Sequence, residues 1–301
     1  MSVPVQKRRL ILHAGTSKTG TSTLQFYLDR NREALKQAGI LYPLEGTTEL
    51  RVPKHQWMVP VLRSGNQSEM RRRMDMVIQE AEGATHTIIL STEGIFNHWW
   101  DFADAAKDML GDFRDRFEVS VWIWFREPVA FFASYYLQAL RNPRIAGIPA
   151  YGHDHALSDL IDMPWAVKHL EYRALLAELG AIFGDASVYA FSYSIDIVTE
   201  VCGLLAVPRY DFNATRENAT SITSAGLDIL RIVNRYQLGE QDKERAYNLA
   251  NQINALIGTR DRAFAVSPDD ADRIRQICGF TQDTLDEIGR ASHTGWAKKY
   301  L

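Results

Sequence analysis

Residues 10–27 read LILHAGTSKTGTSTLQFY, and this stretch constrains the fold more than any other. A short apolar run is followed by a loop that contains Gly15 and Gly20, and then by apolar residues at helical spacing. A buried strand, a glycine-containing loop and a helix start direct backbone N–H groups at one point, where the helix dipole favours an anion. The stretch therefore predicts a phosphate-binding loop between a strand and a helix.

The loop differs from the phosphate loop of nucleoside triphosphatases, which reads Gly-x4-Gly-Lys-Ser/Thr. Gly15 and Gly20 have this spacing, but Thr21 occupies the lysine position and the lysine of the loop is Lys18. A cation three residues earlier reaches a different phosphate oxygen. The sequence therefore favours a phosphate loop that is not that of an ATPase.

Strand and helix patterns alternate over about the first 205 residues, and from about residue 223 only helical periodicity is present. Strands or extended pieces are expected at 10–12, 40–42, 87–90, 117–125 and 187–191. Helices are expected at 22–38, 68–82, 102–110, from 128 onward, at 165–179 and at 196–205, and long loops at 44–66 and 142–155. The order predicts an α/β, P-loop-like three-layer fold with a central parallel sheet and a helical C-terminal part. We expect a single domain over 1–301, with an α/β core at about 1–205 and the helical part at about 223–301.

The composition excludes several classes of protein. The chain has 301 residues, of which 46% are hydrophobic and 24% charged, as is typical of a folded core. Its net charge of −3 provides no field that would attract nucleic acid or anionic lipid. Cys202 and Cys278 lack metal-ligand spacing, and no apolar run approaches the length of a membrane span. We expect a cytoplasmic protein with reduced, buried thiols, no nucleic-acid partner and no stable membrane insertion. Its oligomeric state is left open.

Three polar elements directly follow expected strands: the loop with Lys18, then Glu93, then Arg126. Ligands of an open parallel sheet bind at the carboxyl ends of its strands, so these groups are expected to converge. Arg126 could bind a second phosphate bidentately, and Ser134, eight residues later on the next helix, could add a hydroxyl. The alternatives are a salt bridge at a strand end for Arg126 and a hydroxyl on a helix face for Ser134.

These segments together resemble the PAPS-dependent sulfotransferases. Residues 17–23, SKTGTST, resemble the 5′-phosphosulfate-binding loop of that family, and Arg126-Glu127-Pro128 with Ser134 resembles its 3′-phosphate-binding motif. The segments LHAGTSKTGTSTLQ, LSTEG and FREPVAFFASYY look most like those of bacterial sulfotransferases that act on carbohydrates or related acceptors. The resemblance covers residues 9–28 and 87–140. It implies PAPS as the sulfate donor and PAP as the product.

The resemblance also implies a role for each residue of the two motifs. Lys18 would bind the bridging oxygen between phosphate and sulfate. The N–H groups of residues 19–22, with the hydroxyls of Thr21 and Ser22, would hold the 5′-phosphate, and Arg126 and Ser134 the 3′-phosphate. The donor-binding set is Ser17, Lys18, Thr19, Gly20, Thr21, Ser22, Thr23, Arg126 and Ser134. Sulfuryl transfer, like phosphoryl transfer, depends on positioning and charge stabilisation, so no metal is expected.

The acceptor, a hydroxyl or an amine, needs a base. Glu93 at a strand end could take the proton, and its alternative is a structural role within Ser-Thr-Glu-Gly. His98 and His55 are the other candidates for the base. Residues that could line the acceptor site, or instead pack under long loops, are His55, Trp57, His98 and Trp99. The sequence thus predicts a sulfotransferase acting on a carbohydrate or related small molecule. The alternatives are a P-loop small-molecule kinase and a non-catalytic nucleotide-binding protein.

Overall fold

A computed structural model describes most of the chain. The described residues are 7–16, 19–47, 53–81, 83–142, 144, 150–212, 223–236, 238–257 and 264–300. Two residues of the expected phosphate loop, Ser17 and Lys18, lie outside them.

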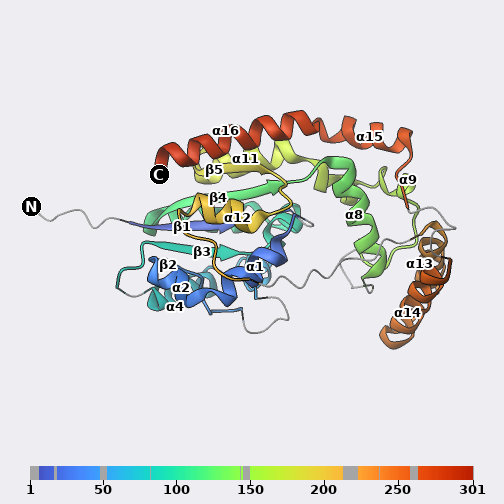
Figure 1. Ribbon diagram of the computed structural model, residues 1–301, viewed down its shortest axis with the longest axis horizontal. Coiled ribbons are helices and arrows are strands. Elements are labelled where there is room, and N and C mark those ends of the chain that lie inside the picture. Colours follow the sequence, from blue (N-terminus) through green and yellow to red (C-terminus); the bar gives the residue numbers. More distant parts are fainter. Residues whose placement is uncertain are drawn as a thin grey trace, which may run out of the picture. The chain divides into compact units, whose positions relative to one another are not determined.

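Five parallel strands form one sheet within the described residues (Figure 1). They are β1 Arg8–His13, β2 Ile40–Leu41, β3 Thr87–Ser91, β4 Phe117–Phe125 and β5 Val188–Ser192. Their order is β2-β3-β1-β4-β5, and every pairing is parallel. The predicted strands and the predicted α/β fold with a central parallel sheet are confirmed.

The register of the central strands determines what lies at the carboxyl edge of the sheet. His13, the last residue of β1, lies opposite Ser91 of β3 and Trp122 of β4. Because β1 is flanked by β3 and β4, the segments that follow these three strands leave the sheet side by side. The loop after His13, Glu93 and Arg126 are therefore neighbours at one edge, as the sequence predicted.

Both faces of the sheet are buried, as expected for a parallel sheet between two layers. Successive side chains of a strand point to opposite faces. On one face, Ile11 packs in a cluster with Tyr27 of α1 (Thr21–Arg30), Val201 of α12 (Ile197–Leu204) and Trp296 of α16 (Gln282–Tyr300). The residues that alternate with this set on β1 and β3 are also buried, namely Leu10, Leu12, Ile88 and Leu90. Helix α16 runs along β5 (Figure 1).

The chain divides into two compact units. The first, Met1–Arg126, Arg173–Thr215 and Gln282–Leu301, contains the sheet. Its other helices are α2 Arg32–Gln37, α3 Met58–Ser64, α4 Gln67–Glu80, α5 Gly94–Asn97, η1 Trp99–Asp101, α6 Asp104–Gly111, α7 Phe113–Arg116, most of α11 Tyr172–Phe183, and η3 Asp185–Ser187. The second unit is helical and comprises Glu127–Tyr172 and Arg216–Thr281. It holds α8 Pro128–Arg141, α9 Leu157–Leu160, α10 Pro164–Val167, η2 Lys168–Leu170, α13 Ser224–Arg235, α14 Glu240–Ile257 and α15 Pro268–Cys278.

Helix α8 packs against α13 and α15 within the second unit, whereas α16 packs against β5 in the first. The last helix of the chain is thus part of the sheet unit. The prediction of one domain over residues 1–301 stays a prediction. Cys202 and Cys278 are both buried, as expected, and they are not joined by a disulfide.

Three predicted elements differ from the structure. The helix expected at 22–38 breaks at Asn31, whose side-chain amide and backbone N–H both donate to the carbonyl of Tyr27. The loop expected at 44–66 contains α3. This helix was not predicted because Pro60 lies within it. Proline is tolerated in the first turn of a helix, where N–H groups have no intrahelical partner.

The helix expected at 165–179 is interrupted at Glu171, so η2 ends there and α11 begins at Tyr172. The loop expected at 142–155 lies partly outside the described residues. Its described part contains neither helix nor strand.

Candidate functional site

Two threonines hold the loop between β1 and α1 in place, and one of them, Thr16, bonds to β4. Thr16 is buried, and its hydroxyl donates to the carbonyl of Trp124 at 2.7 Å. The hydroxyl of Thr19 donates to the carbonyl of Thr16, also at 2.7 Å. Gly20 has φ +83°, a left-handed conformation that favours glycine, and it caps α1. The hydroxyls of Thr16 and Thr19 thus shape the loop, and what Thr19 could offer a ligand is its backbone N–H.

Gly15 is a point of close approach within the loop. A Cβ atom there would lie 2.9 Å from Cγ2 of Thr21 and 3.0 Å from Nε2 of His13. This Nε2 atom is buried and has no hydrogen-bond partner among the described residues. The first turn of α1 contains no acidic residue, and no side chain caps its N-terminus. Gly15 and the uncapped N-terminus of α1 leave room for a phosphate group, and we call this place the phosphate cradle.

The other predicted 5′-phosphate residues lie in the first turn of α1. Thr21 is buried, whereas Ser22 and Thr23 are exposed. The structure therefore places Thr19, Gly20, Thr21, Ser22 and Thr23 consecutively around the helix start. Lys18, the predicted ligand of the bridging oxygen, lies outside the described residues, so its role stays a prediction.

Glu93 lies just after β3 and is held through both carboxylate oxygens. Oε1 is 2.5 Å from Nζ of Lys54, and Oε2 accepts a hydrogen bond from Nε2 of Gln25 at 3.2 Å. Burial disfavours the charged form, but the ammonium of Lys54 and its hydrogen bond outweigh burial and hold the pKa of Glu93 below its usual value. Glu93 is therefore a carboxylate at neutral pH, as a base must be.

Gln25 connects Glu93 to the phosphate loop. Its Nε2 also donates to Oγ of Ser91 at 3.0 Å, and this Oγ lies 2.8 Å from Nδ1 of His13. Burial lowers the pKa of His13 to about 4, so its ring is neutral at pH 7. A continuous polar chain thus runs from the candidate base to the wall of the phosphate cradle.

Arg126 and Ser134 belong to different units of the structure. Arg126 follows β4, and its guanidinium lies 5.4 Å from the centre of the Tyr193 ring, within range of a cation–π contact. Ser134 is half-buried on α8 in the second unit. Pro128 is the first residue of α8, where proline was expected, and the side chain of Glu127 accepts from the N–H of Ala130. A joint 3′-phosphate site of Arg126 and Ser134 stays a prediction.

His55 is fully buried, and both of its ring nitrogens have partners. Nδ1 accepts from the N–H of Ser91 at 3.0 Å, and Nε2 lies 3.2 Å from the carbonyl of Pro43. Burial lowers the pKa of His55 to about 3. A neutral, fully engaged ring is poorly suited to accept a proton from a substrate.

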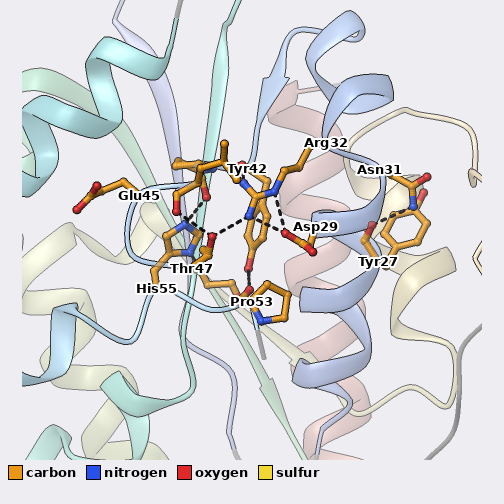
Figure 2. A network of polar contacts seen from close by, with 12 residues as sticks. Tyr27, Asp29, Asn31, Arg32, Tyr42, Glu45, Thr47, Pro53 and His55 are labelled. Carbon is orange, nitrogen blue, oxygen red and sulfur yellow. Dashed lines mark hydrogen bonds and ion pairs between the residues drawn. The ribbon is translucent and has the colours of Figure 1, made fainter. Parts of the chain in front are cut away.

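Figure 2 shows the network around His55. The hydroxyl of Tyr42 donates to the carbonyl of Pro53 at 2.6 Å, and Arg32 donates to the carbonyl of Tyr42 and to the hydroxyl of Thr47. The Tyr42 and His55 rings meet edge to face at 4.9 Å. This network fixes the segment that carries Lys54.

His98, the other candidate base, contacts two charged side chains. Its Nδ1 is 2.8 Å from Nη2 of Arg63 on α3 and 3.1 Å from Oδ2 of Asp101. Burial lowers its pKa, although Asp101 opposes this. These contacts join His98 to α3 and η1, so they lend no support to a part in proton transfer.

The two tryptophans proposed for the acceptor site are interior side chains. Trp57 is 5% exposed and packs so closely on Gly46 that a Cβ atom there would lie 2.1 Å from the ring. Trp99 is fully buried, and its Nε1 donates to Glu178 at 2.8 Å. Their contacts are those of core residues, and their role in acceptor binding stays a prediction.

Sequence reasoning missed Lys54 and Gln25. Lys54 lies in a segment that was expected to be a long loop, and only the fold brings it to Glu93. Gln25 offered a weak signal, because it lies four residues after Thr21 and so faces the same way on α1.

The described part of the chain contains no helix that combines the length and apolarity needed to cross a membrane. Nor does it contain a group of three or more His, Cys, Asp or Glu side chains arranged to hold a metal ion.

No protein-family model matches the chain, and no curated protein matches it. Among solved structures, the chain is similar to a sulfotransferase from Alicyclobacillus acidocaldarius, with a TM-score of 0.43 and 14% sequence identity. That similarity covers 81% of this chain and 100% of the other.

Proposed function

We propose that this chain is a sulfotransferase that moves the sulfuryl group of PAPS to a hydroxyl or amine of a carbohydrate or related small molecule. The observation that supports it best is the strand order β3-β1-β4, which brings three elements to one edge of the sheet. They are Glu93, the glycine loop that leads into α1, and Arg126. Gln25 on α1 donates a hydrogen bond to Glu93, so the helix that begins at the phosphate loop also contacts the candidate base.

The residues divide the chemistry between donor and acceptor. The N–H groups of residues 19–22 and the N-terminus of α1 hold the 5′-phosphate, and Lys18 neutralises charge on the bridging oxygen. Arg126 and Ser134 bind the 3′-phosphate. The acceptor oxygen or nitrogen forms a bond to sulfur, and the bond from sulfur to the bridging oxygen breaks, leaving its electron pair on PAP. Glu93 takes the proton that the acceptor loses.

The first test measures which nucleotide stabilises the fold. A ligand at about 100 times its dissociation constant adds about 2.7 kcal/mol to the unfolding free energy. PAP is expected to raise the melting temperature well above AMP or ATP, because only PAP carries the 3′-phosphate. Equal melting-temperature shifts from PAP and AMP would contradict the proposed 3′-phosphate site. A larger shift from ATP with Mg²⁺ would favour a kinase.

Two arginines at opposite ends of β4 make this test specific. Arg126→Met is expected to abolish the preference for PAP over AMP. Arg116→Met is the matched control, because Arg116 directly precedes β4 and pairs with Asp75 at 2.9 Å. Transfer of labelled sulfate from PAPS to a panel of sugars and amines then separates an enzyme from a protein that only binds the nucleotide.

A further inference from the structure

Two side chains from different parts of the chain bind the carboxylate of Glu93, one at each oxygen. Lys54, from the segment before α3, is 2.5 Å from Oε1, and Gln25, from α1, donates to Oε2 at 3.2 Å. The side chains of Lys54 and Glu93 are only 21% and 17% exposed. An ion pair this sheltered from water is screened less by solvent and salt than a pair on the surface.

Lys54 is held in place by the residues on either side of it. The carbonyl of Pro53 accepts the hydroxyl of Tyr42 at 2.6 Å (Figure 2). His55 exchanges two bonds with Ser91, its N–H donating to the carbonyl at 2.9 Å and its ring accepting from the N–H at 3.0 Å. Because Ser91 ends β3 and Glu93 follows it by two residues, these bonds fix the backbone of Lys54 relative to Glu93.

Gln25 is held just as firmly. Its side chain is fully buried, and its amide nitrogen donates to Oγ of Ser91 as well as to Glu93. The amide plane is therefore set by two acceptors on the same short segment. Since α1 begins at the phosphate loop, Gln25 fixes the direction of the carboxylate relative to that loop.

Two other titratable groups that interact with Glu93, His13 and Tyr42, are uncharged at neutral pH. His13 is neutral because burial lowers its pKa to about 4. Tyr42 is neutral because burial raises the pKa of its hydroxyl. The ammonium of Lys54 offsets the effect of burial on the pKa of Glu93, and the hydrogen bond from Gln25 adds a smaller contribution in the same direction.

We propose that Lys54 and Gln25 are positioning residues that keep the Glu93 carboxylate ionised and aimed at the phosphate loop. Lys54 supplies the charge that lets a mostly buried carboxylate stay deprotonated. Gln25 sets the direction in which this carboxylate points. That this carboxylate then serves as a base rests on the proposed function, whereas its ionisation and orientation do not.

The first experiment needs no activity. Protein labelled with carboxyl-¹³C glutamate is titrated by NMR, and the Glu93 signal is identified as the one missing from Glu93→Gln. In the wild type it should titrate below the ordinary glutamate value of about 4.3. Lys54→Met should move the titration to higher pH, Gln25→Met should move it less, and Lys54→Arg should restore most of the wild-type behaviour. An unchanged Glu93 titration in Lys54→Met would overturn the proposal.

The matched control is Lys107→Met. Lys107, whose side chain is 10% exposed, forms an ion pair with Glu178 in the same unit, with Nζ 2.7 Å from Oε2. Its loss should lower the melting temperature as much as the loss of Lys54, yet leave the Glu93 titration unchanged. A shift of the Glu93 titration in this control would mean that general destabilisation, and not Lys54, controls the carboxylate.

The second experiment uses sulfate transfer. Lys54→Met should move the acidic limb of the kcat/KM profile to higher pH, in parallel with the NMR titration. Gln25→Met should lower kcat by up to about 10²-fold with little change in KM, because a misdirected base leaves binding intact. An unchanged kcat in Gln25→Met would refute its part. If the wild type transfers no sulfate, the proposed function fails while the NMR titration still decides the roles of Lys54 and Gln25.

Discussion

Thr16 donates two hydrogen bonds to a single acceptor, the carbonyl oxygen of Trp124. The hydroxyl lies at 2.7 Å and the backbone nitrogen at 3.3 Å. Thr16 is fully buried, and Trp124 lies two residues before Arg126. One threonine thus joins the loop proposed for the 5′-phosphate to the strand end proposed for the 3′-phosphate.

Replacing Thr16 by valine tests whether this junction matters. Thr16→Val keeps the shape but removes the hydroxyl, which leaves the buried carbonyl with the longer bond alone. We expect a loss of about 1–3 kcal/mol in unfolding free energy and weaker PAP binding. Urea denaturation and calorimetry measure both quantities. Thr16→Ser keeps the donor and should retain most of each, whereas a Thr16→Val protein as stable and as tight-binding as wild type would contradict the argument.

Gly15→Ala should damage the phosphate cradle. The added Cβ would meet Thr21 at 2.9 Å and His13 at 3.0 Å, so the loop must shift. We expect PAP affinity to fall by at least about tenfold, measured by calorimetry. The control is Gly203→Ala in α12, because nothing lies within 4 Å of its added Cβ atom. Alanine is the better helix former, so the control should be neutral or slightly stabilising. Full PAP affinity in Gly15→Ala would show that the cradle is not where the phosphate binds.

Much of the fold could be predicted because each strand contains a run of apolar residues. Residues 117–125 match β4 at both ends, and the glycine loop marks the end of β1 without ambiguity. The breaks at Asn31 and Glu171 could not be predicted, because each depends on local backbone bonds that apolar periodicity does not register. Helix α3 was missed because Pro60 usually reads as a helix breaker.

The candidate site could be predicted only in part. Positions after strands are visible in a sequence, so Glu93 and Arg126 were found. Their partners come from tertiary contacts: Lys54 reaches Glu93 across 39 residues, and Gln25 across 68. Aromatic character alone does not tell an acceptor-site residue from a core residue: Trp99 is buried and donates to the carboxylate of Glu178, and its role in acceptor binding stays a prediction.

Lys18 carries the chemical step in the proposed function. If it neutralises charge on the bridging oxygen, Lys18→Ala should lower turnover by about 10²–10³, with a smaller effect on PAP affinity. Lys18→Arg should recover little, because a guanidinium fork does not replace a point charge. Single-turnover kinetics with parallel PAP titrations check this expectation. Near-normal turnover in Lys18→Ala would remove Lys18 from the mechanism.

Buried neutral histidines should make the fold sensitive to mild acid. Burial lowers the pKa of His13 to about 4 and that of His55 to about 3, against an ordinary value of 6.5. Below pH 6.5 the unfolded chain takes up protons that the folded chain refuses, so unfolding free energy falls with pH. This loss is complete near pH 4 for His13 and near pH 3 for His55. Above pH 6.5 neither state is protonated and the contribution is fully present.

From pH 7 to pH 5, each histidine should remove about 2 kcal/mol. Urea denaturation at several pH values measures this slope. His13→Gln should flatten the slope by about that amount, whatever its effect on stability at pH 7. A slope equal to that of the wild type would mean that His13 is protonated in the folded state, contrary to its burial.

Glu93→Gln tests the base itself. Glutamine keeps the size and can still accept from Gln25, but it cannot take a proton. We expect nearly unchanged PAP affinity and a fall in turnover of about 10²–10⁴. Turnover, PAP affinity and melting temperature are to be measured on one preparation, because a merely structural Glu93 would lower affinity and melting temperature together.

The ion pair adds a complication that a second variant resolves. Glu93→Gln leaves Lys54 without its carboxylate, so some stability should be lost even if Glu93 is the base. Combining it with Lys54→Met removes the unpaired cation and should restore the melting temperature but not turnover. Glu178→Gln breaks the comparable pair with Lys107 and should lower the melting temperature while turnover per folded molecule persists. Full turnover in Glu93→Gln would reject Glu93 as the base. His55 would be a poor alternative base, because both of its ring nitrogens already have hydrogen-bond partners.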